Sequence, residues 1–318
     1  MTKAADKPLV VIAIGGNSLI TDAEHMSVVD QYRAAGETAA YIAPIAENGY
    51  RVVVTHGNGP QVGFILLRSE LAKDMMHQVP LANCVADTQG SIGMQIAQSL
   101  RNEFQRRGRD KDVVAVVTQV VVDEQDPSFQ APTKPIGPFM SEAEARQHAE
   151  EDGWTVAEDA NRGWRRVVPS PTPLEIVELP TIRTLLESGA LVVAAGGGGI
   201  PVIQKPDGDL RPRPAVIDKD AASCLLAKQL NAQVLVFSTD VDKVALNLGT
   251  PQETLIDTMN VNECRAYLDE GHFAVGSMRP KIEAALAFLE AGGEKVIITQ
   301  PHYIEAAMHG EQGTCIVP

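Results

Sequence analysis

Residues 191–203, LVVAAGGGGIPVI, place five apolar residues directly before four consecutive glycines. Glycine loses more backbone freedom on folding than any other residue, so a run of four destabilises a chain unless the backbone needs it. The run therefore predicts either a sharp turn after a buried strand or a place where another group comes very close to the main chain.

Other apolar runs in the chain resemble residues 191–196. They do not alternate between polar and apolar residues, which is typical of parallel strands covered on both faces. Helical patterns lie between most of them, and this alternation predicts an α/β fold, an open three-layer αβα sandwich with a mostly parallel central sheet. The runs are 9–14, 51–56, 112–122, 191–196, 233–239 and 295–299, and the helical patterns include 61–73, 90–107, 180–188, 220–230 and 280–291.

The composition limits the classes of function. The chain has 318 residues and a formal charge of −14, which argues against binding to nucleic acid or to an anionic membrane. No apolar run approaches the length of about 18 residues that crosses a membrane, and the N-terminal residues lack the apolar core of a signal peptide. The four cysteines are far apart and lack metal-ligand spacing, which indicates a reduced, cytoplasmic protein; they are Cys84, Cys224, Cys264 and Cys315.

Residues 123–173 interrupt the alternation of strands and helices with seven prolines. Within them, SEAEARQHAEEDG (141–153) has the pattern of a short helix, in which Ser141 is the N-cap and Glu144 completes a capping box. An unstructured loop of this length is uncommon in a compact domain. We therefore expect an inserted subdomain that projects from the sheet, with a long surface loop as the alternative.

Glycine-rich turns follow three of the predicted strands. In a parallel sheet such turns share the carboxyl edge, where open α/β sheets bind ligands. Consecutive glycines allow backbone N–H groups to point at an anion, so three such turns favour a site for phosphate or another small anion over three tight connections. The turns contain Gly15, Gly16 and Asn17; Gly57, Asn58, Gly59 and Gly63; and Gly196 to Gly199.

The sequence lacks two common phosphate-binding motifs, which limits the kinds of phosphate site that it can form. The chain has no G-x-x-x-x-G-K-[ST] motif. The dinucleotide fingerprint G-x-G-x-x-G is missed by one residue at Gly57, Gly59 and Gly63. An NAD-dependent oxidoreductase therefore remains one alternative. The histidines, including His56, have no nucleophile partner visible in the sequence, so a hydrolase triad is poorly supported.

Two lysines stand near the predicted starts of helices. Lys219 follows Asp218 and precedes Asp220, and a cation in a first turn opposes the helix dipole. Lys281 follows Pro280, which suits the first helical position. A phosphate in front of these helices would make both lysines favourable, whereas the alternative is that both are solvated surface charges.

Two further positions remain open on the residues alone. Lys134 lies between Pro132 and Pro135, which fix the local backbone, so its ammonium is either directed into a site or part of a rigid exposed turn. Asp240 and Asp242 follow the strand at 233–239, where they can hold Mg²⁺, take part in nucleotide binding or form a turn.

Taken together, these stretches resemble the carbamate kinases of the amino acid kinase family. The matching stretches follow one another in the same order as in that family, and together they cover nearly the whole chain. It rests on IAIGGNSL, VTHGNGPQVG, TQVVVDEQDPSFQAPTKPIGPF, RRVVPSPTP, GGGGIPVI, VIDKD, TDVD and EGHFAVGSMRPKIEAA.

The resemblance implies a single amino acid kinase domain with about eight strands in its sheet. Residues 1–210 would form an N-terminal lobe for the acceptor, with 123–173 as a protruding subdomain, and residues 211–318 a C-terminal lobe for the nucleotide. The implied reaction is ATP + carbamate ⇌ ADP + carbamoyl phosphate with Mg²⁺, run toward ATP in the catabolism of amino acids or other nitrogen compounds. The implied assembly is a cytoplasmic homodimer.

The resemblance also implies roles for individual residues. The acceptor and the phosphoryl group would be bound through backbone N–H groups of the three glycine turns, namely at Gly15, Gly16, Asn17, Gly57, Asn58, Gly59, Gly196, Gly197 and Gly198. Catalysis would fall to Lys134, Lys219, Asp220 and Lys281, with Asp220 orienting the lysines. The nucleotide would contact Lys219, Thr239, Asp240, Val241, Gly276, Met278 and Lys281.

Three residues depart from the family pattern near the nucleotide, namely Lys243, Ala245 and Arg279. Two further alternatives also remain. One is a kinase for another small carboxylate or carbamate-like anion, and the other is a non-catalytic sensor of nucleotide or carbamoyl phosphate, because a fold does not prove an activity.

Overall fold

The computed structural model describes residues 7–15, 19, 24–159 and 163–318 of the chain. Its centre is an eight-stranded sheet in which every neighbouring pair is parallel except β16 and β17, so the predicted mostly parallel sheet is confirmed. From edge to edge the strands are β15 (Thr258–Asn260), β17 (Thr314–Val317), β16 (Lys295–Thr299), β12 (Val234–Ser238), β1 (Leu9–Ile14), β2 (Arg51–His56), β9 (Leu191–Val193) and β3 (Val113–Ala115).

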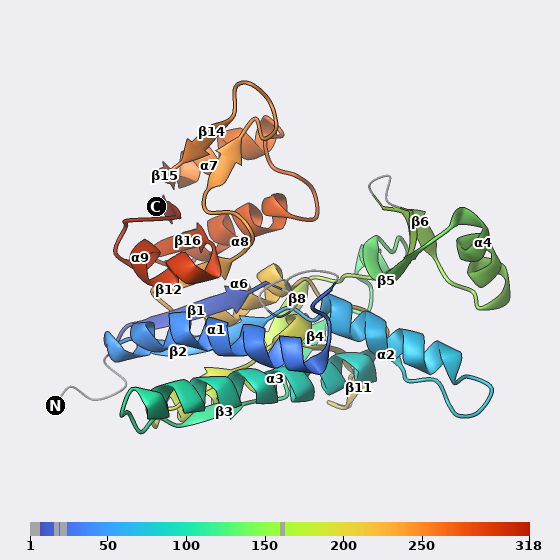
Figure 1. The fold of residues 1–318 in the computed structure, drawn as a ribbon. Coiled ribbons are helices and arrows are strands. Elements are labelled where there is room, and N and C mark those ends of the chain that lie inside the picture. The colour runs from blue at the N-terminus through green and yellow to red at the C-terminus, as the bar shows by residue number, and fades with distance from the viewer. Residues whose placement is uncertain (1–6, 16–18, 20–23, 160–162) are drawn as a thin grey trace.

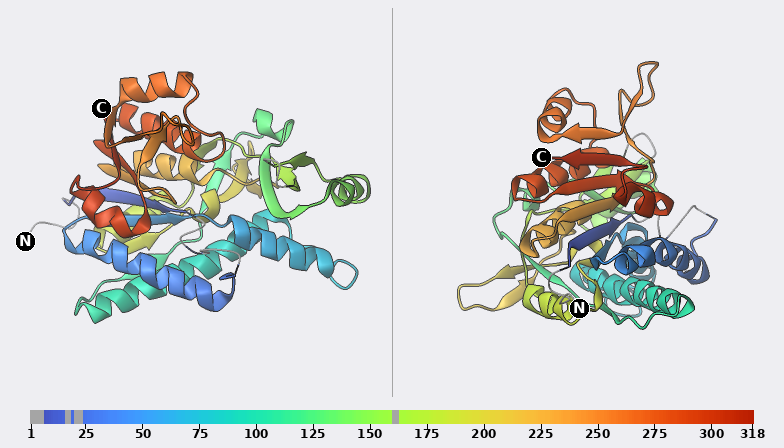
Figure 2. Two further views of the ribbon diagram at one scale, coloured as in Figure 1. Left: turned by 45° about the horizontal axis from the view of Figure 1, so that its top comes forward. Right: turned by 90° about the vertical axis from the view of Figure 1, so that its left-hand side faces the viewer.

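Helices cover both faces of this sheet, which explains why its strands show no polar alternation. All six residues of β1 are buried. Leu9, Val11 and Ala13 belong to one core cluster, and Val10, Ile12 and Ile14 to the other. The first cluster includes residues of α5 (Leu179–Glu187), α6 (Lys219–Gln229), α7 (Val261–Asp269) and α8 (Met278–Glu290); the second includes α1 (Val28–Glu47), α3 (Leu81–Arg106) and α9 (Ile304–Met308). Figure 2 shows the two helical layers on opposite sides of the sheet.

Residues 112–122 do not form the single strand that their apolar run predicts. The chain forms β3 in the central sheet and then β4 (Gln119–Val122), which pairs with β10 (Ile200–Gln204) and β8 (Pro173–Ile176) in a second, four-stranded sheet with β11 (Leu210–Pro212). Both strands are rich in valine, so hydrophobicity gives no sign of the break. The break occurs at residues 116–118, where the Thr118 side chain accepts a hydrogen bond from the amide of Ala195 at 2.9 Å.

Between β4 and β8 the chain forms a small unit that projects from the body of the molecule (Figure 1). It contains a three-stranded sheet of β5 (Lys134–Met140), β7 (Trp164–Val168) and β6 (Val156–Glu158), together with α4 (Glu142–Glu151) and the short helix η3 (Pro127–Phe129). The two ends of this unit lie together because β4 and β8 pair antiparallel, with Val120 opposite Ile176. Residues 123–173 therefore have regular structure of their own.

The predicted helix starts hold with one exception. Ser141 caps α4, and the capping box with Glu144 is present on both sides. Asp218 caps α6, whose first residue is Lys219. Helix α8, however, begins at Met278 after the N-cap Ser277, so Pro280 is not its first residue.

The remaining elements complete the chain. Helix α2 (Gly59–Leu71) packs against β5, and a Cβ on its Gly63 would lie 3.2 Å from the Cα of Gly137. Strands β13 (Val244–Leu246) and β14 (Thr254–Ile256) form a hairpin, and η4 (Gly196–Gly198) and η5 (Pro301–Tyr303) are short 3₁₀ helices. Within the described residues, no helix is long and apolar enough to cross a membrane.

Candidate active site

The three glycine turns meet at the carboxyl edge of neighbouring parallel strands. Strands β1, β2 and β9 are adjacent in the sheet, and each one leads into a turn. The amide of Gly57 donates to the carbonyl of Ile14 at 3.1 Å, and the amide of Gly15 donates to the carbonyl of Ser238 at 3.1 Å. The predicted gathering of these turns is therefore present. Gly16 and Asn17 lie outside the described residues.

The four-glycine run lies where side chains from the second turn press against the backbone. A Cβ on Gly196 would be 2.2 Å from Nε2 of His56, and one on Gly197 would be 2.0 Å from Nδ2 of Asn58. Gly197 also has a φ of +64°, which an L side chain rarely adopts. These two glycines are therefore needed because β2 and its turn occupy the space that a side chain would fill.

The other two glycines of the run are required for the same reason on the opposite side. A Cβ on Gly198 would lie 2.3 Å from the carbonyl oxygen of Ile217, directly before the start of α6. A Cβ on Gly199 would lie 2.2 Å from Cγ2 of Val120 on β4. The close approach that the run predicts is thus made by the protein itself, and it brings β2, β4 and the start of α6 together at one point.

A buried glutamine holds this loop in place, and sequence reasoning missed it. The Gln89 side chain of α3 donates to the carbonyl of Gly196 at 3.0 Å and to that of Thr118 at 3.1 Å, and it accepts from the amide of Thr118 at 2.6 Å. Ala195 has a left-handed φ of 50° and is fixed by its bond to Thr118. The only sequence signal was a polar residue at helical spacing from the apolar Val85, Ile92 and Ile96.

Asp220 lies between two lysines that are distant in the sequence. Its Oδ2 is 3.0 Å from Nζ of Lys281, on α8, and its Oδ1 is 3.3 Å from Nζ of Lys219. The Lys219 ammonium also donates to the carbonyl of Ile14 at 3.4 Å, at the first glycine turn. Asp220 and Lys281 are buried, so this cluster is shielded from bulk water and its charges interact strongly.

Lys134 reaches the same helix start from the projecting unit. It is the first residue of β5, and its Nζ lies 2.7 Å from Oδ2 of Asp218. The other oxygen of Asp218 accepts the amides of Asp220 at 2.8 Å and Ala221 at 3.3 Å. Burial alone would raise the pKa of the Asp218 carboxyl, but Lys134 and these amides outweigh it and hold the pKa below its usual value.

The three predicted lysines are therefore brought together through the first turn of α6. Lys134, Lys219 and Lys281 face the two carboxylates of Asp218 and Asp220. Three ammonium groups against two carboxylates leave the site cationic within an acidic protein. Such a site favours an anionic ligand, and water-shielded cations stabilise charge that develops during group transfer.

His56 adds a neutral group to the site. The ring is 1% exposed, and burial lowers its pKa to about 4, with a smaller effect in the same direction from the nearby Lys219 ammonium. The Gly57 carbonyl opposes this shift, since it lies 2.9 Å from Nδ1. The imidazole is therefore uncharged at neutral pH and does not add to the cationic charge.

The residues expected at the nucleotide lie along the next part of the same edge. Thr239 follows β12, and its amide donates to the carbonyl of Thr299 at 2.9 Å. The carbonyl of Asp240 accepts the Gln300 side chain at 3.1 Å, and Val241 is partly exposed. Gly276 has a φ of +80°, and Met278 begins α8.

The three departures from the family pattern all lie in this half of the chain. Lys243 pairs with Asp257, and Arg279 donates to Glu283 at 2.8 Å. Ala245 lies on β13. Neither charged side chain therefore joins the lysine cluster around Asp220.

Among the described residues, no group of three or more His, Cys, Asp or Glu side chains is arranged to hold a metal ion. A divalent cation at this edge would thus take most of its ligands from a bound phosphate compound and water, as Mg²⁺ commonly does. All four cysteines are free, and burial raises the pKa of each thiol, which makes them poor nucleophiles.

Comparisons with known proteins agree with the resemblance read from the sequence. The sequence model described as "Amino acid kinase family" matches residues 8–300. The carbamate kinase-like protein YahI of Escherichia coli is 49% identical over 98% of this chain and 99% of its own length. The carbamate kinase of Pyrococcus horikoshii is 47% identical over 97% of this chain and 99% of its own length.

Solved structures give the same result for the fold. The carbamate kinase of Giardia lamblia bound to AMP-PNP superposes with a TM-score of 0.92 and 41% identity, over 98% of this chain and 99% of that chain. At this level of similarity the two chains share the same layers and the same sheet. The expected fold class is therefore confirmed over the whole length.

Proposed function

Because this chain belongs to the amino acid kinase family, we propose that it is a carbamate kinase that transfers a phosphoryl group reversibly between ATP and carbamate. The observation that carries the proposal is the meeting of Lys134, Lys219 and Lys281 around Asp218 and Asp220, beside the glycine turns. Full-length relatives named carbamate kinase support the same acceptor. Membership of this family argues against the alternative that the chain is an NAD-dependent oxidoreductase.

In the proposed mechanism the acceptor and the moving phosphoryl group lie at the turns after β1, β2 and β9. The amides of Gly196 and Gly197 donate no hydrogen bond to any other residue that the structure describes, so they suit an anionic oxygen. The corresponding roles of Gly15, Gly57, Asn58, Gly59 and Gly198, and of Gly16 and Asn17, stay predictions. Direct in-line transfer needs positioning and charge neutralisation rather than a covalent enzyme intermediate.

Each charged residue has a proposed part. Lys219, at the start of α6 and beside Ile14, bridges the transferred group and the nucleotide phosphates. Lys281 contacts the nucleotide phosphates, and Asp220 holds both ammonium groups at their places. Lys134 approaches from the acceptor side. When bound with the nucleotide, Mg²⁺ would neutralise phosphate charge.

The division into lobes follows from these assignments. We propose residues 1–210 as the acceptor lobe, with 123–173 as its projecting subdomain, and 211–318 as the nucleotide lobe, where Thr239, Asp240, Val241, Gly276 and Met278 would contact ATP or ADP. The free cysteines fit a cytoplasmic enzyme. We also propose a homodimer, on the family resemblance alone.

The proposal is tested by ATP formation from Mg-ADP and carbamoyl phosphate, with the Lys219→Ala protein as the control. Rapid ATP formation that depends on Lys219 is the expected result. A folded protein that binds ADP and forms no ATP would contradict the proposed acceptor. Acetyl phosphate and similar acyl phosphates then test whether another small carboxylate is the acceptor, and failure with all of them would point to a sensor.

A further inference from the structure

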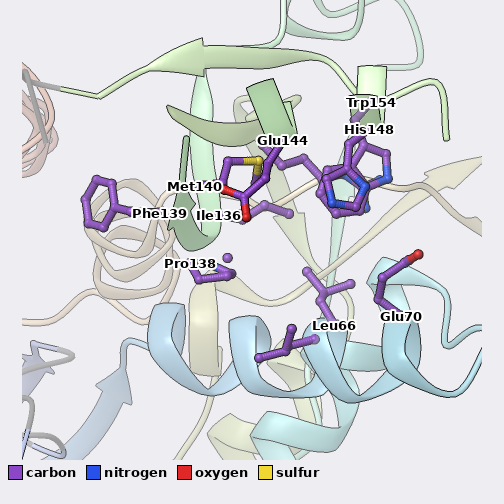
Figure 3. A pocket seen from close by; sticks show the side chains of 12 residues that line it. Leu66, Glu70, Ile136, Pro138, Phe139, Met140, Glu144, His148 and Trp154 are labelled. Carbon is purple, nitrogen blue, oxygen red and sulfur yellow. The ribbon is translucent and has the colours of Figure 1, made fainter. Parts of the chain in front are cut away.

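A cavity of about 240 Å³ lies between the projecting unit and helix α2 (Figure 3). It is lined by residues of α2, β5, α4 and β7 and by Trp154. Helix α2 begins at Gly59 in the second glycine turn, and at 1.5 Å per residue its first lining residue, Leu66, lies roughly 10 Å further along the helix axis. The cavity is therefore distinct from the acceptor and nucleotide positions proposed above.

Most of the cavity wall is apolar. Leu66 and Leu67 come from α2, and the rings of Trp154 and His148 stack on each other with their centroids 4.2 Å apart. For comparison, an apolar cavity of about 150 Å³ in another protein binds benzene. This cavity is thus large enough for a small hydrocarbon or aromatic group. Its other apolar lining residues are Ile136, Pro138, Phe139 and Met140.

One cation in the wall, Arg166, forms no ion pair within the described residues, although the more distant carboxylates of Glu70 and Asp152 act on its charge. The guanidinium carbon of Arg166, on β7, lies 4.8 Å from the centroid of the Trp154 ring. Within the described residues, this guanidinium makes no ion pair and no hydrogen bond. Burial lowers the pKa of Arg166, which reflects the cost of holding its charge away from water. A carboxylate that formed two parallel hydrogen bonds with the guanidinium would offset this cost.

The acidic residues of the wall already have other partners. Glu70 lies 2.6 Å from Nζ of Lys73 and accepts the Gln78 side chain at 2.9 Å. Glu144 accepts the amide and the hydroxyl of Ser141 in the capping box of α4, at 2.8 and 2.7 Å. Neither carboxylate is therefore free to pair with Arg166. The cavity therefore combines a largely apolar wall with one cation, Arg166, that lines it.

We propose that this cavity is a binding site for a small organic carboxylate, whose apolar body lies against Leu66, Ile136 and Trp154 and whose carboxylate pairs with Arg166. The apolar wall favours such a compound over an inorganic anion, which would lose hydration without gaining apolar contact. The bound compound would connect β7 of the projecting unit with α2 of the body. The proposal does not depend on the activity of the lysine cluster.

Isothermal titration calorimetry of the whole protein with 3-phenylpropionate tests the proposal, and the neutral 3-phenylpropionamide serves as the matched ligand. We expect saturable binding of the acid at one site, with the amide weaker by about tenfold or more because it lacks the charge. Arg166→Gln should weaken the acid by about the same factor and leave the amide unchanged. Arg146→Gln on α4, which removes an exposed arginine paired with Glu142, should change neither.

Three outcomes of the titrations would overturn the proposal, and a competition experiment and a second variant each add one more. The first three are no saturable binding of the acid, equal affinity for acid and amide, or an Arg166→Gln protein that binds the acid as well as the wild type does. Binding that saturating Mg-ADP or carbamoyl phosphate displaces would place the acid at the lysine cluster and reject the cavity. If Arg166→Gln does not fold, Leu66→Phe is the substitute variant, because its larger side chain would fill the cavity from α2. Unchanged binding of the acid by Leu66→Phe would then reject the site.

Discussion

The ammonium of Lys281 lies 3.0 Å from Oδ2 of Asp220, although 61 positions separate the two residues in the chain. Both side chains are buried, and the contact joins the first turn of α6 to the first turns of α8. Because Lys219 lies against the other oxygen, Asp220 fixes two cations at once. Asp220 is therefore the counter-charge of both ammonium groups.

Replacing Asp220 by Asn should leave the buried ammonium of Lys281 and the partly buried ammonium of Lys219 without this counter-charge. Removal of one partner of a buried ion pair costs about 3 to 5 kcal/mol, so we expect the free energy of unfolding to fall by about 3 kcal/mol. Urea unfolding of the wild type, Asp220→Asn, Lys281→Met and the double variant measures this. A double variant whose loss equals the sum of the two single losses would show that the pair does not interact.

Lys219→Ala should lower turnover much more than it lowers stability. We expect the barrier to phosphoryl transfer to rise by about 2 to 4 kcal/mol, the cost of losing one transition-state donor in a shielded site. Steady-state ATP formation measures the effect, and Lys228→Ala is the control because that lysine is exposed on the same helix. Unchanged turnover in the Lys219 variant would remove this residue from the mechanism.

Lys134→Ala should act mainly on the acceptor side. The residue approaches from β5 and pairs with Asp218, whereas Lys281 on α8 pairs with Asp220, so we expect a raised KM for carbamoyl phosphate and a smaller change in the KM for ADP. Initial rates with each substrate varied in turn separate the two. Wild-type kinetics for carbamoyl phosphate would reject the proposed role.

Gly197→Ala should both destabilise the protein and abolish activity. The new methyl group would meet the Asn58 side chain, at a backbone φ of +64° that already disfavours alanine. Gly208→Ala separates the two effects, since Gly208 has a φ of +91° and nothing within 4 Å of the new Cβ. We expect a loss of about 1 kcal/mol at Gly208 from the backbone alone and a clearly larger loss at Gly197. Equal losses in thermal or urea unfolding would show that the close packing is not needed.

His56 should make the protein less stable in mild acid. The ring has a pKa of about 4 in the folded protein, against about 6.5 in an unfolded chain, so below pH 6.5 only the unfolded chain gains the proton. The free energy of unfolding should therefore fall by about 3 kcal/mol between pH 6.5 and 4 and receive no further contribution from this residue below pH 4. Urea unfolding across this range should show a shallower dependence in His56→Gln, and an unaltered slope would contradict the assignment.

The sequence predicted the sheet well because its inner strands are continuous apolar runs that need burial on both faces. It could not show that residues 112–122 divide between two sheets, since both halves are rich in valine and the break depends on a long-range bond of Thr118. The glycine run predicted a close approach, but the groups that make it, His56 and Asn58, follow only from the order of the strands.

From the residues alone the lysines were separate positions, and Asp220 as the residue that orients them was implied only by the family resemblance. Lys134 meets Asp218 because β5 returns to the start of α6, which no local pattern encodes. The part that Gln89 plays in holding the glycine loop could not be predicted for a related reason, since its hydrogen-bond partners, Thr118 and Gly196, are far along the chain. Gly16 and Asn17 lie outside the described residues, so their roles stay predictions.

The antiparallel pairing of β4 with β8 has an evolutionary consequence. Because the projecting unit leaves and re-enters the body at adjacent positions, recombination can lengthen, shorten or exchange it as a single cassette without disturbing the central sheet. Lys134 would travel with such a cassette, whereas Lys219 and Lys281 would stay with the body. Lys134 and Arg166 would thus be inherited together, whereas the α2 wall of the cavity would stay with the body and with the residues expected to hold the nucleotide.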